Sequence, residues 1–384
     1  MLLFTWVISV ALALQSADLN SQGLRCLEAG RYVEAEALFR RAVAVWGTEP
    51  GVETVELAAG LSNLGTICAR LGRYREAEAV HERALSIFRR LLGPDRLQTA
   101  SGLINLGTAY LAQGQHAKAE NVFLEALDIS SRTGSTGKHV LATSLNSLGS
   151  LYFTQGRLRD AEQAFQKALT IRQEVVGPDH PDVAVTLSDL AVLYQWEGMF
   201  AKAEVLLERS FEICRRVLGE QHPRVAKVLN NLGVLYASEQ QFTRAEIAFQ
   251  QALSITERAL PPDHPDVVRT KGSLAELYLA QRRNTEAESL YEQIIPRMER
   301  TLGAQHADLL KPLSNLAEAY RADGRYTKAE LLYRRVLAIL SQRPAAMNGE
   351  FRTNLQAYVQ MLRKIKRKTE AHELELQLNT MFPR

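Results

Sequence analysis

The sequence repeats itself with a period of 42 residues, and this period restricts the chain to a repetitive architecture. A small residue recurs in eight copies, at Gly23, Gly65, Gly107, Gly149, Ala191, Gly233, Ala275 and Ala317. Twelve residues later, nine copies carry alanine, at Ala35, Ala77, Ala119, Ala161, Ala203, Ala245, Ala287, Ala329 and Ala371. Glutamate follows in the first eight copies, from Glu36 to Glu330, and His372 follows in the ninth. The pattern predicts eight repeats and a degenerate ninth, each packing on its neighbours.

Each repeat contains the pattern of two helices, as residues 58–99 show. In the first half, apolar residues keep helical spacing at Leu61, Leu64, Ile67, Cys68 and Leu71. Gly72 is expected to end this helix, and a second helix is predicted over 74–92, before Gly93-Pro94. Gly65 and Ala77 are small, so that the two backbones can approach closely. Glu78 falls near the start of the second helix, where the helix dipole favours a carboxylate, so its recurrence indicates a structural role.

The motifs within the period resemble those of a known family. The order Leu-x-x-Leu-Gly-x-x-Tyr, Gly-Arg-Tyr-x-x-Ala-Glu and Ala-Leu resembles the tetratricopeptide repeat, whose usual period is about 34 residues. The 42-residue form, which ends GPDHPDVA at 177–184, is similar to the repeats of kinesin light chains. The resemblance implies an all-α, right-handed superhelical solenoid of antiparallel helix pairs. In this family the first helix of each pair lines the concave side, and the second faces outward.

The N-terminal segment differs from the repeats. Its first fourteen residues, MLLFTWVISVALAL, carry no charged side chain, and Ala11-Leu12-Ala13 is a small-x-small cleavage pattern. We expect residues 1–15 to be a signal peptide, too short to span a membrane comfortably, and the mature protein to be periplasmic or secreted by a bacterium. Left uncleaved, the segment would be a hydrophobic cap on a cytoplasmic protein. Residues 16–351 then hold the eight repeats, and residues 352–384 hold the degenerate ninth repeat or C-terminal cap.

Composition and motif searches point away from several classes of function. The net charge is only +3, which gives no overall attraction to nucleic acid or to an anionic membrane. The three cysteines, Cys26, Cys68 and Cys214, form no CxxC pair, so neither a zinc site nor a disulfide framework is expected. Neither HExxH nor GxSxG occurs, and Gly137-Lys138 lacks the rest of a phosphate loop. We therefore expect no cofactor, no metal and no enzymatic activity.

Histidine recurs once in each of four connectors, at His180, His222, His264 and His306. A shared metal ion is not expected, because equivalent atoms of stacked helices lie roughly 8–10 Å apart, whereas zinc needs ligand nitrogens about 2 Å away. Three of the four histidines precede proline, and Asp182 or Asp266 follows in two connectors. Proline and a carboxylate in the first turn are typical of a helix start, so the histidines are interpreted as connector residues.

The resemblance implies that the second, fifth, sixth, ninth, twelfth and thirteenth residues of each repeat line the groove. With Ala58 as the first residue of its repeat, the fifth and sixth positions hold many small polar residues, among them Asn63, Asn105, Asn146, Asp189, Asn230, Asn231 and Asn315. Asparagine offers both a donor and an acceptor, which suits a peptide backbone. We predict that these residues bind an extended peptide. The alternative is that a solvent-facing groove merely tolerates them.

The second position of each repeat becomes basic late in the chain, at Lys227, Arg269 and Lys311, although Glu276 and Glu318 dilute this charge. These residues predict a preference for acidic partner segments. The sequence as a whole predicts a non-catalytic scaffold that binds a protein or peptide in its groove. The alternative is a structural, self-assembling solenoid. No nucleic acid partner and no integral membrane span in the mature chain are expected, and the oligomeric state stays open.

Overall fold

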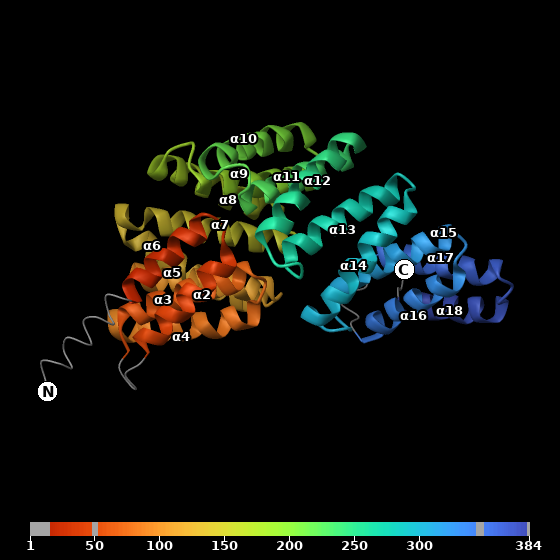
Figure 1. Ribbon diagram of the computed structural model, residues 1–384, viewed down its shortest axis with the longest axis horizontal. Helices are drawn as coiled ribbons and strands as arrows, with labels where there is room; N and C mark the ends of the chain where they lie inside the picture. Colours follow the sequence, from red (N-terminus) through yellow and green to blue (C-terminus); the bar gives the residue numbers. More distant parts are fainter. Residues whose placement is uncertain (1–15, 48–52, 343–348, 382–384) are drawn as a thin grey trace, which may run out of the picture. The chain divides into compact units, whose positions relative to one another are not determined.

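The computed structural model describes residues 16–47, 53–342 and 349–381, and the predicted signal peptide lies outside these ranges. A helix over 16–28 opens the described part, which contains no strand. The α-helices that follow are α2 (Tyr32–Trp46), α3 (Val55–Arg70), α4 (Tyr74–Leu92), α5 (Leu97–Ala112), α6 (His116–Arg132), α7 (Lys138–Thr154), α8 (Leu158–Val176), α9 (Pro181–Trp196), α10 (Phe200–Leu218), α11 (Pro223–Ser238), α12 (Phe242–Ala259), α13 (Pro265–Ala280), α14 (Asn284–Leu302), α15 (Leu310–Ala322), α16 (Tyr326–Gln342), α17 (Gly349–Lys364) and α18 (Lys368–Met381) (Figure 1).

The helices therefore alternate as the 42-residue period predicts, and the all-α class is confirmed. The odd-numbered helices from α3 to α17 are the first helices of their repeats, and the even-numbered helices are the second. Two short 3-10 helices, η1 (Gly134–Gly137) and η2 (Ala307–Leu309), lie in connectors. No helix within the described ranges is both long and apolar enough to cross a membrane.

A tight turn joins the two helices of each repeat, and it requires one residue with a positive φ. In the second repeat this residue is Gly72, with a φ of 76°, and the next amide, of Arg73, donates to the carbonyl of Cys68 at 2.8 Å. Non-glycine residues take the same conformation in repeats six, seven and nine: Gln240, Arg282 and Lys366, with φ between 60° and 64°. Lys366 thus preserves the turn where the sequence departs from Gly-Arg-Tyr.

The recurring glycine of the first helix makes room for a ring from the second helix. A Cβ atom on Gly107 would lie 2.4 Å from Cε1 of Phe123, and one on Gly149 would lie 2.6 Å from Cε1 of Phe165. Gly65 stands in the same relation to the ring of His81. The glycine therefore accommodates a side chain sixteen residues later, a more specific role than the close backbone approach predicted from the sequence.

Three of the four connector histidines cap the helix that begins directly after them, α9, α11 or η2, which confirms their interpretation as helix-start residues. Nδ1 of His180 accepts a hydrogen bond from the amide of Asp182 at 3.1 Å. Nδ1 of His222 accepts from the amide of Arg224 at 3.0 Å, and Nδ1 of His306 accepts from the Asp308 amide at 3.2 Å. Each ring thus supplies an acceptor to an amide that has no partner within the helix.

The chain forms two compact units. Unit 1 contains residues up to Leu235 together with Ser254–His264, and unit 2 contains Tyr236–Leu253 together with residues from Pro265 onward. In unit 1 a core cluster around Leu103, Phe123 and Leu148 links the second, third and fourth repeats. Each repeat therefore completes its core only with its neighbours, as expected of a repeat array.

Candidate functional site

The small polar residues predicted at the fifth and sixth positions of the repeats, which we call the amide ladder, lie on the first helices. Several of them form hydrogen bonds with one another. Nδ2 of Asn63 donates to Oδ1 of Asn20 at 2.9 Å, and Nδ2 of Asn105 donates to Oγ of Ser62 at 3.1 Å. In both pairs the sixth residue of one repeat bonds to the fifth residue of the repeat before it. The amides therefore link adjacent first helices, a role that the sequence analysis did not assign to them.

Asn146 is buried and forms the centre of a polar cluster in unit 1. Only 8% of it is exposed. Its Nδ2 donates to Oδ2 of Asp189 at 2.8 Å, and its Oδ1 accepts from Oγ1 of Thr186 at 2.9 Å and from Nη1 of Arg172 at 3.3 Å. This asparagine already satisfies three hydrogen bonds inside the protein, so it is not open to a ligand in this structure.

Arg172 brings a positive charge into this cluster. It is only 6% exposed, and burial lowers its pKa. Its Nη1 also donates to the carbonyl of Asp182 at 2.8 Å and to Oγ1 of Thr186 at 2.5 Å, whereas Nε has no partner among the described residues. No carboxylate of the described ranges lies within ion-pair distance of it, so neutral acceptors hold the guanidinium in place.

The remaining predicted amides occupy different environments. Asn230 is 3% exposed, and its Oδ1 has no hydrogen-bond partner among the described residues. Asn231 is half-buried and forms no side-chain hydrogen bond within the described ranges. Nδ2 of Asn315 donates to the hydroxyl of the buried Tyr291 at 2.9 Å. Of the adjacent pair Asn230 and Asn231 in α11, only Asn231 reaches the surface.

The three predicted basic residues also differ from one another. Lys227, in unit 1, is exposed and has no ion-pair partner in the described part of the chain. In unit 2, Arg269 pairs with Asp266 at 2.6 Å, and Lys311 pairs with Glu276 at 2.9 Å. Two of the three charges are therefore neutralised locally. Lys227 alone keeps the unpaired charge that the preference for acidic partners requires.

An aromatic pair, which the sequence analysis did not single out, lies at groove positions of adjacent repeats. Phe153 is the twelfth residue of the fourth repeat, and Trp196 is the thirteenth residue of the fifth. Their ring centroids are 6.2 Å apart with an interplanar angle of 83°, an edge-to-face contact. Trp196 is 74% exposed and Phe153 is half-buried. An isolated tryptophan at a predicted groove position was the available signal in the sequence.

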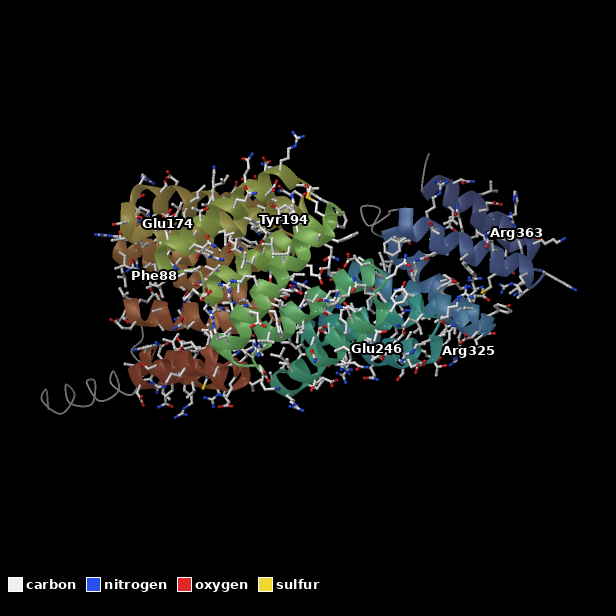
Figure 2. The ribbon with its side chains drawn as sticks, turned by 90° about the horizontal axis from the view of Figure 1, so that it is seen from above. Phe88, Glu174, Tyr194, Glu246, Arg325 and Arg363 are labelled. Carbon is white, nitrogen blue, oxygen red and sulfur yellow. The ribbon has the colours of Figure 1, made fainter. Side chains whose placement is uncertain are left out.

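The recurring glutamate of the second helix also has a role that the sequence analysis missed. It pairs with an arginine 37 residues later, at the turn of the next repeat, in five pairs with N–O distances of 2.6 to 3.1 Å: Glu36–Arg73, Glu120–Arg157, Glu246–Arg283, Glu288–Arg325 and Glu330–Arg367. Figure 2 shows two members in unit 2, Glu246 and Arg325. In these five copies the glutamate therefore stabilises the contact between repeats, in addition to its place near the positive end of the helix dipole.

Some of these arginines also cover a tyrosine of the first helix. The guanidinium of Arg283 lies 4.1 Å from the ring centroid of Tyr278, whose hydroxyl donates to Glu246 at 3.1 Å. Arg325 lies 4.5 Å from the ring centroid of Tyr320. These tyrosines thus stack with a cation of their own repeat and hydrogen-bond to a glutamate of the preceding repeat.

A hollow in unit 1 lies among α4, α5 and α6 and has a volume of about 690 Å³. Leu85, Leu103, Leu106 and Val122 provide its apolar lining, and the ion pair between Arg89 and Glu125 crosses its rim. The lining comes mainly from the second helices, so this hollow is separate from the predicted groove positions. Among the described residues, no group of histidine, cysteine and carboxylate side chains could hold a metal ion.

The alternating helix pairs, with polar residues at equivalent positions of the first helices, identify the chain as a helical repeat protein. The description "Tetratricopeptide repeat" fits residues 14–79, 56–132, 141–182, 182–258 and 266–342. The chain belongs to the tetratricopeptide repeat family, as the motifs predicted. This fold is typical of protein–protein interaction scaffolds and is generally non-catalytic.

Several solved structures are similar to the chain. BtubC (BKLC) from P. vanneervenii is 27% identical, with 60% of this chain and 91% of that chain covered and a TM-score of 0.47. A putative kinesin light chain of Podosopora anserina, with nearly identical TPR-like repeats, is 27% identical, with 52% and 94% covered and a TM-score of 0.44.

A more extensive likeness in fold, at lower identity, is found with a Rap protein complexed with Competence and Sporulation Factor. It is 17% identical, with 86% of this chain and 99% of that chain covered and a TM-score of 0.57. No curated protein matches the sequence. The structural likeness therefore supports the fold.

Proposed function

We propose that the protein is a non-catalytic scaffold that binds an extended segment of a partner protein against the face of its first helices. Family membership supports a role in protein–protein interaction. The face itself supplies polar groups at the fifth and sixth positions, of which Asn231 is half-buried and has no partner among the described residues. The chemistry fits a peptide backbone, which needs both donors and acceptors.

The exposure of Trp196 is the observation that carries this proposal. A tryptophan that is 74% exposed leaves a large apolar surface in water, and such surfaces mark interaction sites. The edge contact with Phe153 holds the ring in place, so that little conformational freedom remains to be lost on binding. We therefore propose that Trp196 receives an apolar side chain of the partner segment.

Lys227 gives the protein a preference for a partner segment with negative charge. It is exposed at the second position of the sixth repeat and has no ion-pair partner in the described ranges. An acidic residue in the partner segment would pair with it. A single exposed pair contributes only about 0.2–1 kcal/mol, so the preference is modest and weakens with salt.

The test begins with the proteins that co-purify with this chain from its native host. The dissociation constant of an identified partner is then measured for the wild type and for Trp196→Ala. Truncation of a central aromatic anchor is expected to cost about 2 kcal/mol, or roughly thirtyfold in Kd. The control is Val205→Ala, which removes a side chain of similar exposure from the second helix of the same repeat.

An unchanged Kd in Trp196→Ala would exclude Trp196 as the anchor of the partner segment. The hollow among α4, α5 and α6 would then be the next surface to test. Concentration-dependent light scattering that disappears in Trp196→Ala would instead favour the self-assembling alternative, in which a second copy covers this residue.

We also propose that the protein acts outside the cytoplasm of a bacterium. The support is the uncharged apolar sequence of residues 1–14 and the Ala11-Leu12-Ala13 pattern. N-terminal sequencing of protein from the native host is expected to begin between Leu14 and Asp18. An intact Met1 terminus on cytosolic protein would contradict the proposal.

A further inference from the structure

Two histidine contacts in unit 1 join parts of the chain that lie far apart in the sequence. Nε2 of His222 lies 3.0 Å from the carbonyl oxygen of Glu28, and Nε2 of His264 bonds to the carbonyl oxygen of Arg70. Both pairs are separated by 194 residues. Because the second pair is displaced from the first by one full repeat at both ends, the two contacts are successive copies of one arrangement.

The contacts join opposite edges of the repeat array. Glu28 and Arg70 lie at the C-terminal ends of the first helices of repeats one and two, next to the turns that lead to the second helices. His222 and His264 lie in the connectors that precede α11 and α13. One edge of the array carries the turns within repeats, and the other carries the connectors between repeats, so unit 1 brings its own two edges together.

We name the place where the two edges meet the seam, and it comprises Glu28, Gly30, Arg70, His222, Pro223 and His264. The two edges are also closely packed here. A Cβ atom on Gly30 would lie 2.5 Å from Cδ of Pro223. His222 is 6% exposed and His264 is 5% exposed. By contrast, the side chain of His180, which caps its helix in the same way, is 42% exposed. Burial therefore distinguishes the connector histidines of the seam from His180, which lies outside it.

Hydrogen bonding fixes the state of the His222 ring. Its Nδ1 accepts from the amide of Arg224, so in the neutral ring Nε2 carries the proton and donates to the Glu28 carbonyl. One tautomer thus begins α11 and holds the two edges together. His180 makes the first of these bonds, but among the described residues its ring has no partner across the array.

We propose that the seam is a closure between the two edges of unit 1, and that its opening controls sideways access of a partner to the face of the first helices. This inference rests on the proposed function. With the seam closed, a partner segment reaches that face only by entering with a free end. With the seam open, an internal segment of a folded partner can also enter from the side.

The closure itself can be measured without any partner. Spin labels on Glu28→Cys and Gln221→Cys lie on opposite edges of the seam, at positions that are exposed, whereas Cys26, Cys68 and Cys214 are buried. Double electron–electron resonance is expected to give one short, narrow distance distribution in the otherwise wild-type protein. Hydrogen exchange of the unlabelled protein, at residues 28–31 and 221–224, checks that the labels do not disturb the seam.

Two kinds of variant should open the seam, and each has a matched control. In the double variant His222→Asn, His264→Asn, asparagine can still cap the helix, but its side chain is too short to reach the opposite edge. The control is His180→Asn. In Gly30→Ala the new methyl group meets Pro223, whereas Gly156→Ala places a methyl group at the same φ of +74° with no atom within 4 Å.

Both opening variants are expected to lengthen and broaden the distance distribution and to speed exchange at the seam at least about fivefold, while both controls stay as the wild type. Distances and exchange that stay unchanged in both opening variants would overturn the closure. This outcome says nothing against partner binding, so it is distinct from a failure of the proposed function.

Access is tested with a chemical probe on a cysteine at Ser21, an exposed sixth-position residue of the first repeat. We compare its rates of reaction with a long polyethylene-glycol maleimide and with N-ethylmaleimide. Opening the seam is expected to raise the ratio of these rates at least about fivefold, with no rise in either control. An unchanged ratio alongside lengthened distances would overturn the control of access.

Discussion

The interface between repeats two and three and the interface between repeats four and five use equivalent positions in opposite ways. In the first, Phe88 is buried, and its Cδ2 would lie 3.7 Å from a Cβ atom on Gly102. In the second, residues 84 positions later, Arg172 and Thr186, form a buried hydrogen bond with each other. The repeat backbone therefore accepts either an apolar contact or a polar cluster at one position of the period.

The difference shows what the period does and does not determine. Helix boundaries and the small alanines are common to all repeats, because every repeat must stack in the same way. The side chains between repeats need only fill their volume and satisfy their own polar groups. Swapping residues between equivalent positions is therefore the most direct way to test how each interface is stabilised.

The largest effect is expected from Asn146→Ala. The change leaves the Arg172 guanidinium, the Thr186 hydroxyl and the Asp189 carboxylate each without one hydrogen bond. Such losses at buried polar groups should lower the free energy of unfolding by about 2–4 kcal/mol. Urea unfolding followed by circular dichroism measures the change. Ser62→Ala, at the equivalent position of repeat two, is expected to cost only about 0.5–1 kcal/mol. Equal costs would show that the polar cluster is no more important than a single ladder bond.

His81→Phe is expected to change the free energy of unfolding in the opposite direction, as a gain in stability. His81 is 1% exposed, its Nδ1 has no partner among the described residues, and burial lowers its pKa to about 4. Phe39, Phe123 and Phe165 occupy the equivalent position, so a phenylalanine fits against the glycine of the first helix. The variant should gain about 1–2 kcal/mol at neutral pH, because it removes an unsatisfied buried nitrogen.

The gain should also depend on pH. The folded-state pKa of His81 lies below the unfolded value of 6.5, so the wild type loses stability as the pH falls from about 6.5 towards 4. The advantage of His81→Phe should therefore grow over this range in thermal unfolding. The control is the exposed His139→Phe. A constant difference from pH 7 to pH 4 would mean that His81 does not stay neutral in the folded protein.

The sequence predicted the helices well, because eight copies of one pattern each indicate the same boundaries. The turn after each first helix was predicted from Gly72 and its equivalents, and even Lys366 takes the required conformation. The histidine connectors were also predicted. These features depend on residues close together in the chain, where helix spacing and caps are sufficient evidence.

Contacts between repeats were not predicted, for two physical reasons. The side-chain amide of Asn105 donates to Ser62 because stacking brings the fifth and sixth positions of adjacent repeats together. The seam depends on how far each repeat rotates relative to the one before, and single-repeat patterns contain no information about that rotation. The Glu36–Arg73 spacing of 37 residues, in contrast, occurs in five pairs that follow the 42-residue period, often enough to be found in the sequence.

A smaller effect on stability is expected within the amide ladder, where two alanine variants distinguish a role in partner binding from a role in stability. Asn105→Ala removes the bond to Ser62 and should lower the free energy of unfolding by about 0.5–1 kcal/mol. Asn231→Ala, at the same position three repeats later, removes no side-chain bond of the described residues and replaces asparagine by a better helix former. It should leave the melting temperature equal or slightly higher and weaken partner binding. If Asn231→Ala destabilises as much as Asn105→Ala, the amides act mainly between repeats.

The smallest effect is expected from exchanging Arg73 and Gln115, which occupy equivalent turns. Arg73 pairs with Glu36 at 2.6 Å, whereas Nε2 of Gln115 lies 3.4 Å from Glu78. Burial raises the pKa of Glu36, but hydrogen bonds from Arg73 and Arg40 outweigh it and hold the pKa below 4.5. Because solvent still reaches the pair, with 39% of the Arg73 side chain and 16% of the Glu36 side chain exposed, Arg73→Gln should cost only about 0.5 kcal/mol, and Gln115→Arg should gain a similar amount.

Measurements at different salt concentrations and pH values test whether Arg73→Gln and Gln115→Arg change stability through charge. High salt should reduce both effects, since charge pairs that solvent reaches are screened. The contribution of Glu36 is present above pH 4.5 and is lost as the pH falls through its folded-state pKa, so the wild type and Arg73→Gln should converge in acid. Thermal unfolding at two salt concentrations and across this pH range measures both trends. A difference that persists in acid and in high salt would show that Arg73 acts through its packing and its hydrogen bonds, and that the recurring glutamate contributes little through its charge.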